Sequence, residues 1–165
     1  MAKRKLFNLN YTQFNELLTE FDGLGGEMKP VVTKALEEAA KTVERDTIKA
    51  MEPSNLPAHG KYSRNPSKTK QSIVRNAKVE WSGTTASVGI GFDFSKPGAG
   101  GFLITGYYRS SEINGTARME PNIELQRIYG GWAKGHNRYK REIQENMAKV
   151  VRDAINKKIG GKNGK

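Results

Sequence analysis

Two long stretches of the chain carry apolar residues at the spacing of one helix face. In the stretch from Lys29 to Met51, these positions are Val32, Leu36, Ala39, Val43 and Ala50. In the stretch from Asn137 to Ile159, the stripe consists of Ile143, Met147, Val150, Val151 and Ala154, and Lys158 continues it with its aliphatic stem. Recurrence at intervals of three and four residues is typical of an amphipathic helix with one buried side. We therefore predict two long helices, one in each half of the chain.

Two shorter helices are predicted by the same spacing. Tyr11 to Asp22 contains an apolar stripe of Phe14, Leu17, Leu18 and Phe21, and glycines follow it. Ile123 to Tyr129 is long enough for one or two turns, and Gly130-Gly131 comes directly after it. Glycine after the last helical residue is a common helix stop, because it adopts positive φ at little cost.

Alternation of apolar and polar residues predicts strands in the middle of the chain. Ala77 to Trp81 and Thr85 to Phe94 both alternate, and Ser82-Gly83-Thr84 between them has the composition of a hairpin turn. Phe102 to Tyr108 is a third predicted strand. The stretch from Ser110 to Met119 is polar, and we assign no element to it.

The remaining segments are rich in glycine, proline and polar residues. We expect an N-terminal arm over residues 1–10, long irregular loops over 52–70 and 93–101, and a flexible basic tail over 160–165. The chain of 165 residues has the length of one domain. The predicted fold is a single α+β domain over 1–165. In it, a small antiparallel sheet of about three to four strands packs against the two long amphipathic helices.

Candidate chemistry is sparse along the chain. There is no cysteine, which excludes disulfides, thiolate nucleophiles and cysteine-bound zinc. The two histidines, His59 and His136, lack partners at metal-ligand spacing. Gly89-Ile90-Gly91 lies within a predicted strand, where a phosphate-binding loop would instead open a helix. We expect no catalytic residue, no cofactor and no metal, and hence a protein that is not an enzyme.

Charge is the more informative feature. The chain has 28 Lys and Arg against 17 Asp and Glu, a formal net charge of +11. Between His59 and Lys78 there is no acidic residue, while the cations are Lys61, Arg64, Lys68, Lys70, Arg75 and Lys78. Such a run is compatible with a nearby phosphate backbone, an acidic protein partner or a simple solvated loop.

A second basic cluster contains aromatic residues. Lys134, Arg138, Lys140 and Arg141 surround Trp132 and Tyr139 in the sequence. Aromatic residues beside cations can stack on exposed bases of nucleic acid. No sequence-reading motif accompanies them, so nucleic-acid contact would be nonspecific. No apolar run is long enough to cross a bilayer, and no signal peptide is expected after Met1. We expect a chain made in the cytoplasm that has no membrane contact.

The linear plan resembles the tail-completion, or head–tail joining, proteins of long-tailed, siphovirus-like bacteriophages. The resemblance extends over residues 11–158. It depends on four segments: Phe14-Asn15-Glu16-Leu17-Leu18, Lys34-Ala35-Leu36-Glu37-Glu38-Ala39-Ala40, Lys68-Thr69-Lys70-Gln71-Ser72-Ile73 and Ser87-Val88-Gly89.

This resemblance implies a structural protein of the virion. Members of the family form a ring, typically of six copies, at the top of the tail around the DNA channel. The ring lies between the tail terminator and the head-completion, or connector, proteins. We expect the Lys61–Lys78 stretch and the Phe102–Tyr108 region to supply surfaces that face neighbouring subunits or DNA. The candidate residues are Lys61, Arg64, Lys68, Lys70, Arg75, Lys78, Phe102, Tyr107, Tyr108 and Arg109. The alternative is a monomeric, nonspecific nucleic-acid-binding protein.

Overall fold

The computed structural model describes residues 7–10, 19, 27–52, 66–83, 85–98, 100–111 and 115–162. The helix expected over Tyr11–Asp22 falls outside these residues except for Thr19. In chain order, the elements are β1 (Phe7–Asn10), α2 (Met28–Ala50), α3 (Pro66–Gln71), β2 (Val79–Ser82), β3 (Thr85–Ile90), α4 (Gly100–Thr105), β4 (Tyr107–Ser111), β5 (Gly115–Met119), α5 (Ile123–Tyr129) and α6 (Arg138–Lys162).

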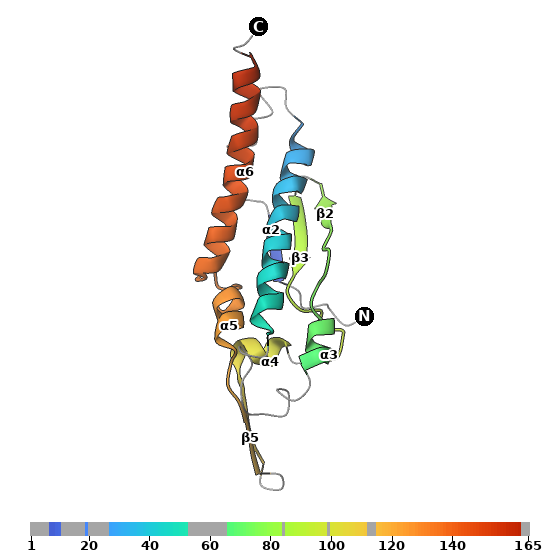
Figure 1. Cartoon of the computed structure of the whole chain (residues 1–165), viewed down its shortest axis with the longest axis vertical. Coiled ribbons are helices and arrows are strands. Elements are labelled where there is room, and N and C mark those ends of the chain that lie inside the picture. Colours follow the sequence, from blue (N-terminus) through green and yellow to red (C-terminus); the bar gives the residue numbers. More distant parts are fainter. Residues whose placement is uncertain are drawn as a thin grey trace.

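The body of the molecule has three layers, with α2 in the middle (Figure 1). A three-stranded antiparallel sheet of order β1-β3-β2 covers one side of α2. The helix α6 runs antiparallel to α2 on the other side. The predicted α+β class, with a small antiparallel sheet and two long helices, is therefore confirmed.

The central position of α2 follows from its small and apolar residues. All five positions of the predicted stripe are buried, and Ala35, Ala40 and Thr47 are buried with them. A single stripe would serve one partner, whereas these added positions widen the apolar surface so that two neighbours can pack on it. On α6, Ile143, Met147, Val151 and Ile155 are buried. Within the predicted α6 stripe, Val150 and Ala154 are half-buried and Lys158 is exposed.

The hairpin of β2 and β3 forms where the alternating pattern predicts it. Ser82 pairs with Thr85, and Gly83 has a φ of 61° in the turn. On β3, Ala86, Val88 and Ile90 are buried, while the residues between them are exposed or half-buried. This alternation places one face of the sheet against α2.

The structure of the middle of the chain differs from the prediction in two places. Residues 102–105 are the end of helix α4, and only the last two residues of the predicted Phe102–Tyr108 strand lie in β4. The run of apolar residues was too short for its period to separate helix from strand. The polar stretch after it forms the hairpin of β4 and β5, which the sequence pattern did not reveal.

Four segments expected to be irregular contain regular structure. Within the expected N-terminal arm, β1 pairs with β3. The loop expected over 52–70 ends in α3, and the loop over 93–101 ends where α4 begins at Gly100. The expected tail over 160–165 begins inside α6, which continues to Lys162. Pairing with β3 explains β1, because four residues have too little local pattern to predict a strand by themselves.

Four aromatic residues form a cluster in the core between the sheet and α5: Phe7, Phe92, Tyr129 and Trp132. Phe7 stacks on Tyr129 with ring centroids 4.6 Å apart, and both rings lie near Trp132. Phe92 follows the end of β3, and its ring centroid lies 6.2 Å from that of Tyr129. Gly91, at a φ of 93°, leaves room for the Phe7 and Tyr129 rings. The cluster therefore joins the first strand to the short helix α5.

We predict that Gly100→Ala destabilises the fold, because its Cβ would overlap the ring of buried Phe92. Overpacking of this kind costs about 1–3 kcal/mol. The matched control is Gly160→Ala in α6, whose added Cβ meets nothing within 4 Å and should raise stability slightly. Urea unfolding followed by circular dichroism measures both. Equal midpoints for the two variants would contradict the packing around Gly100.

Candidate assembly surface

Three large apolar side chains are exposed around α4. Phe94 is 41% exposed, Phe102 39% and Ile123 78%. The ring of Phe94 lies against Gly101, and the N–H of Asn122, the residue before Ile123, donates to the carbonyl of Leu103 at 2.7 Å. We call these three side chains the α4 patch. Clustered exposed apolar surface is typical of an interaction site.

The β4–β5 hairpin projects from the same end of the molecule (Figure 1). It leaves the body after α4 and returns to it before α5. Its strands pair from Tyr107↔Met119 to Ser111↔Gly115 and contact mainly each other. Within the described residues, no third strand joins this sheet, so the outer edge of each strand is open.

Lysines flank this end of the body. Lys68 is exposed and Lys70 half-buried on α3, and Lys96 is exposed in the segment between Asp93 and Gly98. That segment packs on α3, because the N–H of Asp93 donates to the carbonyl of Ser72 at 2.7 Å and Gly98 lies against Thr69. None of the three lysines forms an ion pair with another described residue. Lys96 was not among the predicted residues, because it is remote from the basic run in sequence.

The structure brings together only some of the predicted surface residues. Lys68, Lys70 and Phe102 lie at the α3–α4 end, and Tyr107, Tyr108 and Arg109 are the first three residues of β4. Lys78 is exposed just before β2. Lys61 and Arg64 lie outside the described residues.

Arg75 has a structural partner. Its Nη1 lies 3.6 Å from Oε1 of Glu44 on α2, and the other oxygen of Glu44 accepts a hydrogen bond from the N–H of Asn76 at 2.8 Å. Glu44 thus attaches the segment after α3 to the central helix, so Arg75 contributes to this attachment.

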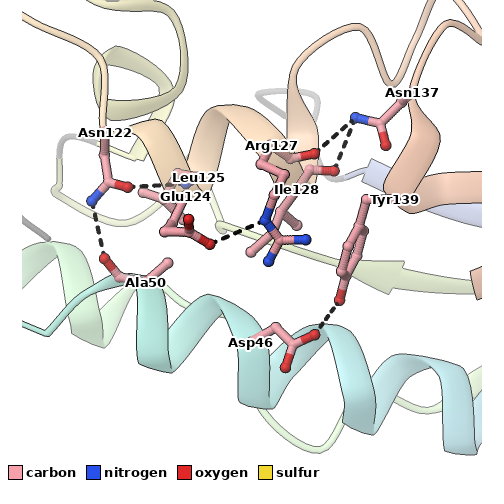
Figure 2. A network of polar contacts seen from close by, with 9 residues as sticks. All are labelled: Asp46, Ala50, Asn122, Glu124, Leu125, Arg127, Ile128, Asn137 and Tyr139. Atoms are coloured by element: carbon pink, nitrogen blue, oxygen red, sulfur yellow. Dashed lines mark hydrogen bonds and ion pairs between the residues drawn. The ribbon is translucent and has the colours of Figure 1, made fainter. Parts of the chain in front are cut away.

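Asn122 fixes the base of the hairpin relative to the body (Figure 2). Its Oδ1 accepts a hydrogen bond from the N–H of Leu125 at 3.0 Å and so caps the N-terminus of α5. Its Nδ2 donates to the carbonyl of Ala50 at 3.0 Å, at the end of α2. With its own N–H on Leu103, this one residue connects α2, α4 and α5, and it is buried.

Asn137 performs a similar role at the other end of α5. Its Oδ1 accepts a hydrogen bond from the N–H of Lys140 at 2.7 Å, which caps α6. Its Nδ2 donates to the carbonyls of Ile128, at 3.2 Å, and Gly130. The amide therefore satisfies groups at the end of α5 and the start of α6 together.

Two buried tyrosines add hydrogen bonds that join α5 and α6 to α2. The Tyr139 hydroxyl donates to Oδ2 of Asp46 on α2 at 2.7 Å (Figure 2). The Tyr129 hydroxyl shares a hydrogen bond with Oγ1 of Thr47. Burial raises the pKa of both tyrosines far above the ordinary value, and the bond to Asp46 raises that of Tyr139 further. Both hydroxyls therefore keep their protons even in alkaline solution, where an exposed tyrosine ionises.

The second basic cluster does not offer rings for base stacking. Trp132 is 3% exposed and Tyr139 6%, because both belong to the core. Lys140 lies 5.5 Å from the centroid of Trp132, and Arg127 lies 5.2 Å from that of Tyr139. The cations thus cover the outer sides of buried rings. The base stacking considered for this cluster is therefore closed to these two rings, because both are packed in the core.

The described residues contain no group of three or more His, Asp or Glu arranged to hold a metal ion. His136 is exposed, and His59 lies outside the described residues. A groove of about 110 Å³ between α2 and α6 is lined mainly by apolar atoms of residues such as Ala35, Ala39 and Met147. Among the described helices, none is long and apolar enough to cross a membrane.

We predict that Asn137→Ala lowers the free energy of unfolding by about 2 kcal/mol, from loss of the cap and of the bonds to buried carbonyls. Asn137→Ser keeps an oxygen that can cap α6, and we expect it to recover about half of that loss. Urea unfolding of the two variants and the parent measures the difference. Equal stability of the Ala and Ser variants would show that the cap contributes nothing.

Comparison of the chain with protein-family models, with curated proteins and with solved structures gave no match. The comparisons therefore assign no family.

Proposed function

We propose that this protein is a structural subunit of a phage neck. In this proposal it is a tail-completion, or head–tail joining, subunit that forms a ring with other copies at the top of the tail, around the DNA channel. The ring lies between the tail terminator and the head-completion or connector proteins. The role requires surfaces for neighbours and no catalytic site.

The observation that supports the proposal best is the β4–β5 hairpin with the α4 patch at its base. A two-stranded hairpin has marginal stability in water by itself. Its open strand edges are templates for pairing with another chain. The adjacent Phe94, Phe102 and Ile123 offer apolar surface that a neighbour would remove from water. An assembly subunit accounts for both features.

The lysines at the same end suit the neighbours expected in a neck. Lys68, Lys70 and Lys96 are free of ion pairs with described residues. Their ammonium groups can attract acidic residues of an adjoining ring or the phosphates of passing DNA.

Deleting the gene from the phage genome that carries it tests the assembly role. We expect lysates to contain DNA-filled heads beside separate, full-length tails, because the joining ring would be missing. Electron microscopy of the lysate distinguishes these particles from whole virions, and a plasmid copy of the gene should restore joining. Normal virions in the deletion lysate would exclude the neck function.

A point substitution tests the α4 patch itself. We predict that Ile123→Ser reduces the yield of joined particles at least tenfold in the deletion strain, while the melting temperature of the purified protein changes little. The side chain is 78% exposed, so its loss costs the isolated subunit little.

The matched control is Ile159→Ser, another exposed isoleucine near the C-terminal end of α6, remote from the patch (Figure 1). We expect this control to join heads and tails as the parent does. Equal particle yields for the two variants would remove the α4 patch from the assembly surface.

A further inference from the structure

Within the described residues, β2 is the last strand on one side of the body sheet. The sheet order is β1-β3-β2, and no described strand pairs with the far side of β2. In Figure 1, β2 lies at the outer side of the body, and β3 and α2 both lie to the same side of it. Val79 and Trp81 are half-buried, whereas Glu80 and Ser82 are exposed. The four residues contain no proline, so the alternate N–H groups that point away from β3 can enter a ladder.

The β4–β5 hairpin is a matching strand donor. Its strands are five residues long, against four in β2. It extends beyond α4 and α5, away from the β2 edge of its own chain (Figure 1). The same chain therefore carries an open edge at one place and a projecting pair of strands at another. A second copy of the chain has a hairpin that fits the β2 edge of the first copy, and a β2 edge that fits a hairpin.

Charge also favours this pairing over association of two identical edges. Glu80 forms no ion pair with any described residue. Each strand of the hairpin carries one arginine, Arg109 in β4 and Arg118 in β5, and neither strand has an acidic residue. Opposite charges across adjacent strands stabilise pairing, and like charges oppose it. Two β2 edges would instead bring Glu80 of both copies together.

We propose that the β4–β5 hairpin of one copy pairs with the β2 edge of a second copy and extends its three-stranded sheet. The contact is heterologous, since each copy donates its hairpin to one neighbour and accepts a hairpin from another. Contacts of this type close into rings when the rotation between copies is suitable. The inference rests on the proposed function, for which it names the partner surface.

The absence of cysteine from the chain allows a direct test. Glu80→Cys marks the β2 edge, and Arg109→Cys or Arg118→Cys marks one strand of the hairpin, because the charge argument places an arginine opposite Glu80 and neighbouring residues of a strand face opposite sides of the sheet. Adjacent strands lie about 4.7–4.9 Å apart, within the Cα separation that a disulfide spans. Two singly substituted proteins, one with each kind of mark, are mixed in concentrated solution, oxidised and separated on a non-reducing gel.

We expect a linked heterodimer from Glu80→Cys mixed with one of the hairpin variants. A chain carrying both marks should give a ladder of multimers, because each copy then has two neighbours. The control is Glu145→Cys, an exposed glutamate on α6, which lies on the opposite side of α2 from the sheet. It should link to the hairpin variants no faster than random collision allows.

Two results would overturn the pairing. One is linkage of Glu80→Cys that does not exceed linkage of Glu145→Cys, and the other is a double variant that links only within single chains. If either occurs while gene deletion still separates heads from tails, the neck function stands and the strand pairing alone is wrong. If deletion leaves normal virions, the neck function fails whatever the gel shows.

Discussion

The burial of α2 on two opposite sides is the constraint on which the rest of the structure depends. Val32, Leu36 and Val43 belong to a helix that has the sheet on one side and α6 on the other. Alanines at Ala35, Ala39 and Ala40 keep this helix thin enough for both neighbours to approach. Because α2 is shared, neither the small sheet nor α6 needs another partner to bury its apolar face.

The buried side chain of Asn122 connects this packed core to the surface hairpin. Asn122 is bonded to the end of α2 and to α4, and it caps α5. The β4–β5 hairpin lies between α4 and α5 in sequence, so the position of its base is determined by that residue. Buried amides of this kind are costly unless every group is paired, and the pairing defines one arrangement of the helices.

The distribution of aromatic and apolar side chains between core and surface bears on the proposed assembly role. Trp132 and Tyr139, which could have stacked on bases, are in the core, and Lys140 and Arg127 cover them. Exposed apolar residues are instead found around α4, beside a hairpin with open edges. Lys68, Lys70 and Lys96 add positive charge near these surfaces. A subunit that buries such surfaces against its neighbours is consistent with all three features.

The sequence by itself determined the elements whose signals are local. The two long helices follow from many repeats of a 3.6-residue period, and the β2–β3 hairpin follows from alternation around Gly83. Tertiary structure alone decided that β1 joins the sheet, that Phe102 lies in a helix and that the polar stretch after Tyr108 forms a hairpin. These segments are short, so their conformation depends on partners remote in the chain. For the same reason, the pairing of Arg75 with Glu44 and the proximity of Lys96 to α3 could not be predicted. Such contacts depend on how elements pack, and packing leaves no periodic signal in the sequence.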